Sequence, residues 1–247
     1  MPTKPTPNSP PDAAPLLAFG AHPDDIEFGC GGVIAAETRA GSAAHFVVCS
    51  RGESATNGTP AQRTRETNAA AALLGATVEF ADLGGDAHFE ESVAHVLALA
   101  KIIRRVRPAL VLAPSTVEHQ HPDHAKLGRL VRDAARLARY GGVKELRALV
   151  PHAVGSLLFY AVTPEAEPAD RAKFLFDVSA PEILAAWTMA MAAHATQAKT
   201  RDYVELQLTR ARLHGLRAGV GHAIALFASD APVFTSLAPL MRSTRRF

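Results

Sequence analysis

Histidine and aspartate side chains gather in two short stretches of the sequence. The first, His-Pro-Asp-Asp, begins at His22, and the second, His-Pro-Asp-His, begins at His121. Imidazole nitrogens and carboxylate oxygens are ligands of catalytic zinc, which commonly takes three protein ligands and leaves a fourth position for water. The spacings His22-x-x-Asp25 and His121-x-x-His124 suit such a ligand set. The two stretches therefore predict a metal site, where a carboxylate that is not a ligand can serve as general base.

Each stretch follows a short apolar run and precedes a helical pattern. Residues 16–19 predict a strand before the first stretch, and residues 109–113 predict a buried strand before the second. Ligands of open α/β sheets bind in the crevice at the carboxyl ends of the strands. We therefore expect the two stretches to meet at the same edge of one sheet.

Strand and helix patterns alternate along most of the chain. Strands are expected at residues 16–19, 44–49, 77–80, 109–113, 156–162 and 174–178, and helices at residues 29–40, 63–74, 91–106, 125–140, 181–197 and 203–216. This alternation favours parallel βαβ units with right-handed crossovers. The predicted fold class is α/β: a Rossmann-like, mostly parallel sheet flanked by helices, with the active site at the carboxyl ends of the strands.

Length and composition indicate one large domain. With 247 residues and 48% hydrophobic content, we expect a disordered proline-rich leader over residues 1–15, a single α/β domain over 16–240 and a basic tail over 241–247. A formal charge of +2 without a basic stripe argues against nucleic acid as a partner. The sequence offers no apolar stretch long enough to span a membrane, so a cytoplasmic protein is expected. Cys30 and Cys49 are expected to be buried free thiols.

The sequence resembles a known enzyme family. AHPDD-x-E followed by Gly-Gly, with HPDH downstream, is similar to the PIG-L/LmbE-like zinc-dependent N-acetylglucosamine deacetylases, and the likeness extends over about residues 16–234. That family includes deacetylases of mycothiol and bacillithiol biosynthesis, of glycosylphosphatidylinositol precursors and of some antibiotics. The resemblance implies a hydrolase that removes the acetyl group from an N-acetylglucosamine-type sugar or conjugate, with a bacillithiol-type precursor as one candidate. The products would be acetate and a free amine.

The resemblance also implies a ligand set. It makes His22, Asp25 and His124 the zinc ligands and Asp24 the general base that takes a proton from the attacking water. Spacing alone leaves open which of Asp24 and Asp25 is the ligand. Zinc is the expected cofactor, although sites of this type also accept Fe2+, Mn2+ or Co2+.

Further roles follow from the same resemblance. His121 would stabilise the developing oxyanion or help to protonate the leaving amine, and Asp123 would hold His121 charged and oriented. Arg51, Glu53 and Arg63 lie where the family builds its sugar pocket, which makes them candidate substrate contacts. The expected partner is a small amino-sugar substrate, and a homo-oligomer is left open.

Other interpretations compete with this one. The same metal site could cleave another small N-acyl substrate, or the chain could be a metal-retaining binding protein without catalysis. The presence of a candidate base and of an oxyanion partner argues against a pure binding protein. A Rossmann-type nucleotide binder is disfavoured because residues 29–32 lack the G-x-G-x-x-G order. The carboxylates near residue 25 could also serve only to cap a helix.

Overall fold

The computed structural model describes residues 14–119, 121–199 and 201–244. Within these residues seven strands form one sheet in the order β3-β2-β1-β4-β5-β7-β6. The strands β3, β2, β1, β4 and β5 pair in parallel, whereas β7 is antiparallel to both β5 and β6. The strands are β1 (Leu16–Gly20), β2 (Ala44–Val48), β3 (Ala76–Phe80), β4 (Leu110–Pro114), β5 (Ser156–Tyr160), β6 (Lys173–Asp177) and β7 (Ala223–Ala228).

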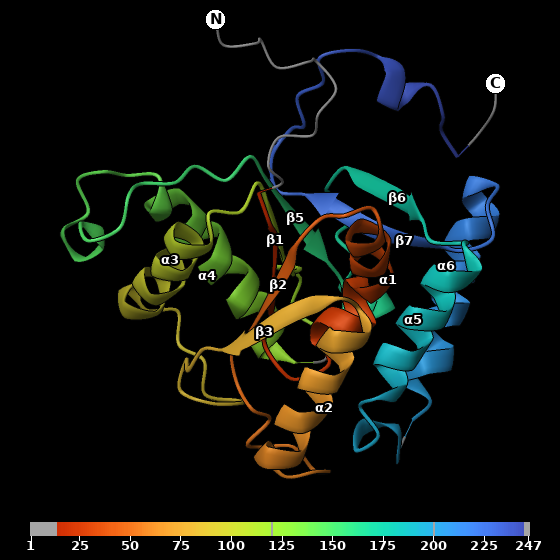
Figure 1. The fold of residues 1–247 in the computed structure, drawn as a ribbon, viewed down its shortest axis with the longest axis horizontal. Helices are drawn as coiled ribbons and strands as arrows, with labels where there is room; N and C mark the ends of the chain where they lie inside the picture. Colours follow the sequence, from red (N-terminus) through yellow and green to blue (C-terminus); the bar gives the residue numbers. More distant parts are fainter. Residues whose placement is uncertain (1–13, 120, 200, 245–247) are drawn as a thin grey trace, which may run out of the picture.

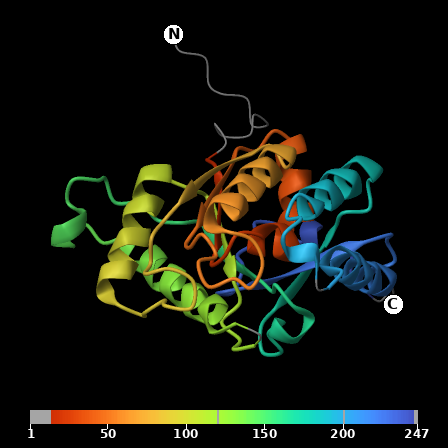
Figure 2. The same cartoon turned by 90° about the horizontal axis from the view of Figure 1, so that it is seen from below.

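Helices cover both faces of the sheet. The α-helices of the described residues are α1 (Asp25–Arg39), α2 (Pro60–Leu73), α3 (Val93–Val106), α4 (Pro122–Ala138), α5 (Pro181–Ala192) and α6 (Tyr203–Ala218). Helices α3 and α4 lie on one face, and α1, α2, α5 and α6 lie on the other (Figure 1), as the turned view also shows (Figure 2). The predicted α/β fold with a mostly parallel sheet is confirmed.

Strand β7 is the element that the sequence pattern does not predict. All its residues are buried, so it lacks the polar alternation that marks a half-buried strand, and a short apolar run can belong to either a strand or a helix. The helix expected over 181–197 ends at Ala192 and is followed by the 3-10 helix η3 (Gln197–Lys199). The antiparallel edge of the sheet is therefore decided by tertiary pairing.

Several expectations concern the ends of the chain and the thiols. Residues 1–13 of the expected leader and residues 245–247 of the expected tail lie outside the described residues. Cys30 and Cys49 are free and buried, as predicted. Among the described helices, none combines the length and the apolar character that a membrane span requires.

Strand β1 is buried on both faces. Leu16 and Ala18 pack into the core beneath α1 and α5, whereas Leu17 and Phe19 pack into the core beneath α3 and α4. Successive side chains of a strand point to opposite faces, so a central strand between two helical layers must be apolar at every position. This explains why the run before the first His-Asp stretch shows no alternation.

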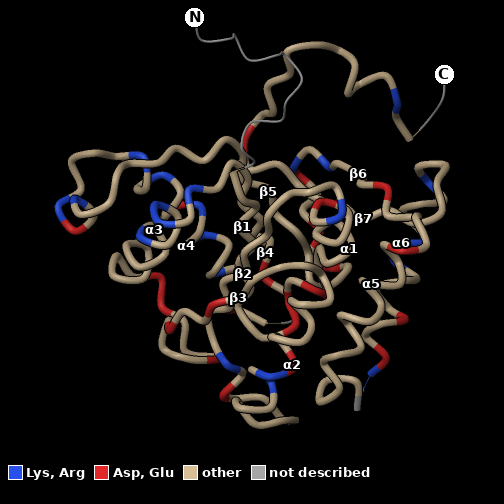
Figure 3. Tube along the Cα trace, viewed as in Figure 1, with Lys and Arg blue, Asp and Glu red and all other residues tan. Residues whose placement is uncertain are grey.

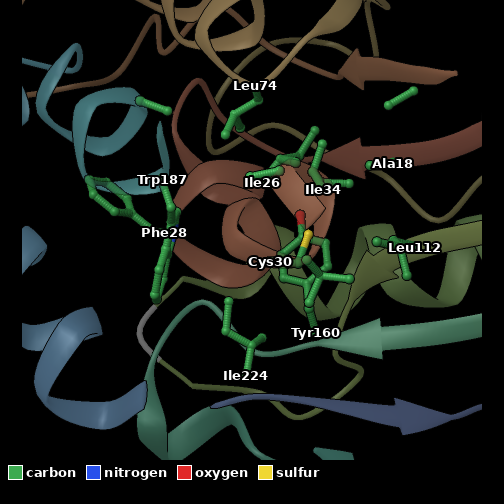
Figure 4. Close-up of a cluster of buried hydrophobic side chains, with 14 of the residues drawn as sticks. Ala18, Ile26, Phe28, Cys30, Ile34, Leu74, Leu112, Tyr160, Trp187 and Ile224 are labelled. Atoms are coloured by element: carbon green, nitrogen blue, oxygen red, sulfur yellow. The ribbon is translucent and has the colours of Figure 1, made fainter. Parts of the chain in front are cut away.

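Helix α1 approaches its neighbours closely because glycines face them. A Cβ atom at Gly29 would lie 2.1 Å from the Tyr160 ring, and one at Gly31 would lie 2.8 Å from Cδ1 of Trp187. Tyr160 and Trp187 flank the helix in Figure 4. The Trp187 indole N–H also donates a hydrogen bond to the carbonyl of Glu27 (2.7 Å). These contacts hold the first turn of α1 against the sheet and against α5.

A half-buried carboxylate joins elements in the last third of the chain. Glu167 follows the 3-10 helix η2 (Pro164–Ala166) and accepts hydrogen bonds from Lys173 in β6 (2.6 Å) and from Arg210 in α6 (2.9 Å). Nε2 of His214, also in α6, lies 2.8 Å from the same carboxylate. Burial alone would raise the pKa of Glu167, but these three partners outweigh it and hold the pKa well below its usual value.

Glu167→Gln is expected to destabilise the fold in a pH-dependent way. The depressed pKa means that the ionised carboxylate stabilises the folded state above the unfolded-state pKa of about 4.3 and that this stabilisation is lost as pH falls below it. We expect a loss of roughly 1–3 kcal/mol in the free energy of unfolding at pH 7. In urea titrations the difference from wild type should shrink below a pH of about 4.3.

The control is Glu118→Gln, because the Glu118 side chain is 73% exposed and pairs with Arg129 at 3.3 Å. An exposed ion pair of this kind contributes at most about 1 kcal/mol. Equal destabilisation by the Glu118 and Glu167 substitutions would contradict the prediction.

Candidate active site at the carboxyl ends of the strands

Loops that follow three parallel strands converge at one edge of the sheet. The loop after β1 carries His22 and Asp24, the loop after β4 leads to His121, and the loop after β3 carries Asp86. Figure 3 shows several Asp and Glu positions, in red, near the centre of the molecule around the labels of β3 and β4. The two predicted His-Asp stretches thus meet at the expected edge.

The residues predicted as metal ligands form one compact group. Nδ1 of His22 lies 3.2 Å from Nε2 of His124, and the Asp25 carboxylate lies 3.6 Å from the His22 nitrogen and 3.0 Å from the His124 nitrogen. Two ligand atoms about 2.1 Å from a tetrahedral zinc are separated by roughly 3.4 Å. The three side chains are also buried. One donor atom from each of the three side chains lies within 4.8 Å of the others, so the group could hold a divalent cation.

Backbone hydrogen bonds fix the shared carboxylate of this group. Oδ2 of Asp25 accepts from the backbone N–H groups of Ala21 (2.8 Å) and His22 (2.9 Å), which leaves Oδ1 directed to His124. Burial raises the pKa of Asp25, but His124 and His22 outweigh it, so the pKa lies well below its usual value. For His22 burial lowers the pKa, and Asp25 with the other nearby carboxylates raises it well above its usual value. A metal cation would take the place of this proton.

Asp24 lies beside the ligand group and has a different environment. Its φ of 109° is rare for a residue other than glycine, and a strained conformation of this kind is frequent at functional sites. Its Oδ2 accepts a hydrogen bond from Arg63 (3.1 Å), which also donates to the carbonyl of Pro23 (2.6 Å). Burial raises the pKa of Asp24 to about 6, although the Arg63 cation acts in the opposite direction.

His121 lines the same pocket, and the centroid of its ring lies 4.4 Å from that of His22. Its Nδ1 accepts a hydrogen bond from the backbone N–H of Asp123 (3.3 Å), and its Nε2 lies 3.5 Å from Oδ1 of Asp86. Burial and the neighbouring His22 lower the pKa of His121, although Asp123 and Asp86 raise it. Oδ2 of Asp123 lies 3.8 Å from Nδ1 of His121 and also accepts from the backbone N–H of Ala87 (2.8 Å), and the expectation that Asp123 keeps His121 charged stays a prediction.

The candidate substrate contacts are distributed unevenly around the site. Arg63 lines the pocket. Arg51 lies over the ring of Phe80, with 4.5 Å between Cζ and the centroid. Glu53 accepts hydrogen bonds from the backbone N–H groups of Arg51 and Asp86, both at 2.9 Å. Glu53 therefore fixes the loop after β3, and contact of Arg51 or Glu53 with a substrate stays a prediction.

A pocket of about 470 Å³ opens in front of these residues. Apart from the histidines, the aspartates and Arg63, its wall is uncharged, with two aromatic rings and several carboxamide or hydroxyl groups. Members of this wall are Phe28, Asn57, Thr163, Gln197, Tyr203 and Gln207. They come from segments distant in sequence, so motif spacing could not find them.

Asp86 is a site residue that the sequence analysis did not single out. Its carboxylate lies 3.2 Å from Nε2 of His22, and its backbone is held by Glu53. A signal was present, because Asp86 lies in a polar loop directly after the predicted strand 77–80. The rule that places ligands at the carboxyl ends of strands applies to this loop as well.

A second buried pair lies behind Asp24. Nε2 of His194 is 3.4 Å from Oε1 of Glu27, and both side chains are almost fully buried. Burial lowers the pKa of His194, but Glu27 and Asp24 raise it, and the net shift is upward. Neither ring nitrogen has a hydrogen-bond partner among the described residues. Glu27 therefore contacts the buried His194 side chain, so its role is not limited to capping the start of α1.

Comparison with known proteins identifies the family. Residues 17–135 match the family model PIG-L, described as GlcNAc-PI de-N-acetylase. The chain belongs to the PIG-L family. Members of this family include deacetylases, so an enzyme is supported. The matched residues include both His-Asp stretches and the loop that carries Asp86.

Relatives of this PIG-L protein differ in their named activities. The conserved protein TT1542 of Thermus thermophilus is 30% identical, with a TM-score of 0.79 over 92% of this chain and 99% of that chain. The 4-oxalmesaconate hydratase of Pseudomonas putida (strain KT2440) is 33% identical over 160 residues, which are 60% of each chain. The N,N'-diacetylchitobiose deacetylase of Pyrococcus horikoshii shares the fold, with 23% identity and a TM-score of 0.76 over 89% of this chain and 85% of that chain.

Zinc is expected to stabilise the metal-stripped protein through the His22, Asp25 and His124 group. A ligand that binds only the folded state adds about 2.7 kcal/mol at a free concentration of about 100 times its Kd. Wild type should therefore melt at a higher temperature with one equivalent of Zn2+, and Asp25→Asn should lose this gain. Scanning calorimetry measures both.

The matched control is Asp133→Asn, because Asp133 is an exposed carboxylate that pairs with Arg136. This variant should keep the zinc-induced rise in melting temperature. A full rise in the Asp25 variant would show that the ligand set is wrong.

Proposed function

We propose that this PIG-L protein is a divalent-metal-dependent N-deacetylase of N-acetylglucosamine-type sugars or conjugates. The observation that carries the proposal is the position of Asp24, which lies beside the His22, Asp25 and His124 group in the same pocket as His121. A base, a cation site and an oxyanion partner around one cavity are what amide hydrolysis by water requires. The products are acetate and a free amine.

The metal would be held by Nδ1 of His22, the Asp25 carboxylate and Nε2 of His124. When bound, a divalent cation supplies Lewis-acid polarisation of the acyl carbonyl and increases the acidity of water. Zinc is the expected ion on the basis of this nitrogen and oxygen donor set, and Fe2+, Mn2+ and Co2+ accept similar donors.

Asp24 is proposed as the general base. It takes a proton from the water whose oxygen forms the new bond to the acyl carbon, and the C–N bond of the amide then breaks as the nitrogen receives the proton that Asp24 took up. The hydrogen bond from Arg63 holds the carboxylate in place at 3.1 Å. Burial, which raises the pKa of Asp24 to about 6, makes this carboxylate a stronger base than a solvated one.

His121 is proposed to stabilise the oxyanion as a neutral donor. Because its Nδ1 accepts from Asp123 N–H, the ring proton belongs on Nε2, the nitrogen near Asp86. An N–H at that position can donate to an oxygen that gains negative charge. Asp123 would position the loop through Ala87 N–H, instead of keeping His121 charged.

The pocket wall supports a neutral, hydroxyl-bearing substrate. Phe28 and Tyr203, with ring centroids 5.6 Å apart, offer apolar surface for a sugar ring. Among the described lining residues Arg63 is the sole Lys or Arg, and Asp24 and the Pro23 carbonyl already engage it. We further propose that residues 16–240 form one catalytic domain, because the pocket draws on residues from His22 to Gln207.

Hydration of a carbon–carbon double bond is the second candidate function. The 33% identity to a hydratase supports it, and a base beside a cation site can also direct water to an activated alkene. A substrate such as 4-oxalmesaconate, however, carries several carboxylates. Arg63 already donates hydrogen bonds to Asp24 and to the Pro23 carbonyl, so it is not free to pair with these carboxylates. Deacetylation therefore remains the first proposal.

Asp24→Ala is expected to abolish turnover and leave the metal bound. The substitution removes the proposed base and none of the proposed ligands, so acetate release should fall by about 10²–10⁴-fold, the usual contribution of general base catalysis. Metal analysis by mass spectrometry gives the metal content, and single-turnover acetate release gives the rate. If the variant loses its metal instead, the roles of Asp24 and Asp25 are reversed.

Acetate release tests the function directly. The metal-stripped enzyme, reloaded with one equivalent of zinc, should release acetate from N-acetylglucosamine, its inositol and malate conjugates or diacetylchitobiose, with one of them well above the others. The malate conjugate represents the bacillithiol-type candidate. Loss of 4-oxalmesaconate absorbance without acetate release from any sugar would replace deacetylation by hydration.

A further inference from the structure

We propose that Gln197 is a specificity-determining residue, whose amide oxygen accepts a hydrogen bond from a hydroxyl group of the substrate. A chain of hydrogen bonds that begins at Glu66 in α2 fixes the direction of this carboxamide. Gln197 begins the 3-10 helix η3 after α5 and lines the same pocket as His22, Asp25 and His124. The inference rests on the proposed function, because it assigns one contact of the sugar substrate.

Glu66 holds Thr196 through both of its carboxylate oxygens. Oε1 accepts a hydrogen bond from the backbone N–H of Thr196 (3.0 Å), and Oε2 accepts one from the Thr196 hydroxyl (2.7 Å). An ionised carboxylate can only accept hydrogen bonds. The hydroxyl proton of Thr196 is therefore committed to Glu66, and the hydroxyl oxygen can only accept from any other partner.

The two neighbours of the Gln197 carboxamide both require its nitrogen. Nε2 donates to the Thr196 hydroxyl oxygen (3.0 Å) and to the backbone carbonyl of Asn57 (3.1 Å). The reverse orientation would place Oε1 against two oxygen atoms that have no proton to give it. Because a carbonyl can only accept, Asn57 fixes the direction of the amide independently of Glu66. Both amide hydrogens of Gln197 are used, and Oε1 is the atom left over.

The amide oxygen of Gln197 is open to a ligand. It accepts no hydrogen bond from the residues that the structure describes, and the side chain is partly exposed where it lines the pocket. An amide oxygen accepts but cannot donate. It therefore favours a group that carries a proton, such as a hydroxyl, and disfavours a carboxylate, which would face it with a second acceptor. The hydroxyl groups of an amino sugar meet this requirement.

Close packing keeps this hydrogen-bond chain in place. Gly58 has a φ of 81°, and a Cβ atom there would lie 2.8 Å from Cγ2 of Thr196. The backbone N–H of Gln197 also donates to the carbonyl of His194 (2.9 Å). Helices α2 and α5 pack side by side (Figure 1), which holds Glu66 next to the segment that follows α5. An acceptor fixed before the substrate arrives loses less conformational entropy on binding.

Gln197→Met tests the proposal, because methionine has a similar length and no amide oxygen. The substrates are the N-acetylglucosamine compound that gives the fastest acetate release and its deoxy and deoxyfluoro analogues at each ring hydroxyl. In wild type, loss of one particular hydroxyl should lower kcat/KM by about 2–10-fold, the usual size of one neutral hydrogen bond. Fluorine has no proton to donate, so the deoxyfluoro analogue should lose as much. In Gln197→Met this penalty should disappear.

Glu66→Ala tests the positioning chain. It should raise KM and leave kcat close to the wild-type value, because it weakens binding that substrate and transition state share. Glu66→Gln should restore KM, since a carboxamide can accept from Thr196 N–H and donate to the Thr196 hydroxyl oxygen. The control is Asn68→Met, an exposed carboxamide of α2 outside the pocket lining. Circular dichroism checks each fold, and Thr196→Val replaces Glu66→Ala if the latter is unfolded.

The outcomes separate this inference from the proposed function. Acetate release with equal analogue penalties in wild type and Gln197→Met would overturn the inference and leave deacetylation standing. No acetate release from any sugar would refute deacetylation, and calorimetric titration of the zinc-loaded protein with the same sugars would then decide the subsite. Weaker binding of one deoxy sugar by wild type, but not by Gln197→Met, would support it. Equal affinities, or no binding of any sugar, would overturn it.

Discussion

The Asp25 carboxylate is the interaction on which the site depends. One oxygen accepts from the backbone N–H groups of Ala21 and His22, and the other lies 3.0 Å from Nε2 of His124. A single buried charge thus joins the end of β1, the start of α1 and the first turn of α4. A buried carboxylate is costly unless it is paired and hydrogen-bonded, and here the backbone donors and two imidazoles supply those partners.

The position of that carboxylate depends in turn on how closely α1 packs. Gly29 and Gly31 allow the helix to lie against Tyr160 and Trp187, and any side chain at Gly29 would overlap the Tyr160 ring. Close-packed interiors transmit small shifts, and a catalytic group displaced by about 1 Å can lose most of its effect. The apolar core on this face of the sheet therefore also sets the geometry of the site.

Polar atoms left without hydrogen bonds concentrate around the pocket. His22, Asp123, Glu27, His194 and Thr163 all contribute such atoms within the described residues. A fold maintains unsatisfied buried groups only where other interactions compensate, and such exceptions are frequent at functional sites.

The sequence by itself determined the α/β class, the parallel strands that precede each His-Asp stretch and the meeting of those stretches at one edge. These features follow from local patterns, since a buried strand is an apolar run and a motif keeps its spacing in any fold. Motif resemblance also supplied the choice between Asp24 and Asp25, which spacing left open. That choice stays a prediction, and the Asp25 carboxylate lies 3.6 Å from the His22 nitrogen and 3.0 Å from the His124 nitrogen.

Tertiary structure alone decided the antiparallel β7, the contact between Asp86 and His22, the downward shift of the His121 pKa and the uncharged wall around Thr163 and Tyr203. Each of these depends on segments far apart in the chain. The charge of a histidine or the partner of a carboxylate is set by every group packed around it, and sequence spacing carries no record of neighbours that only the folded chain brings together.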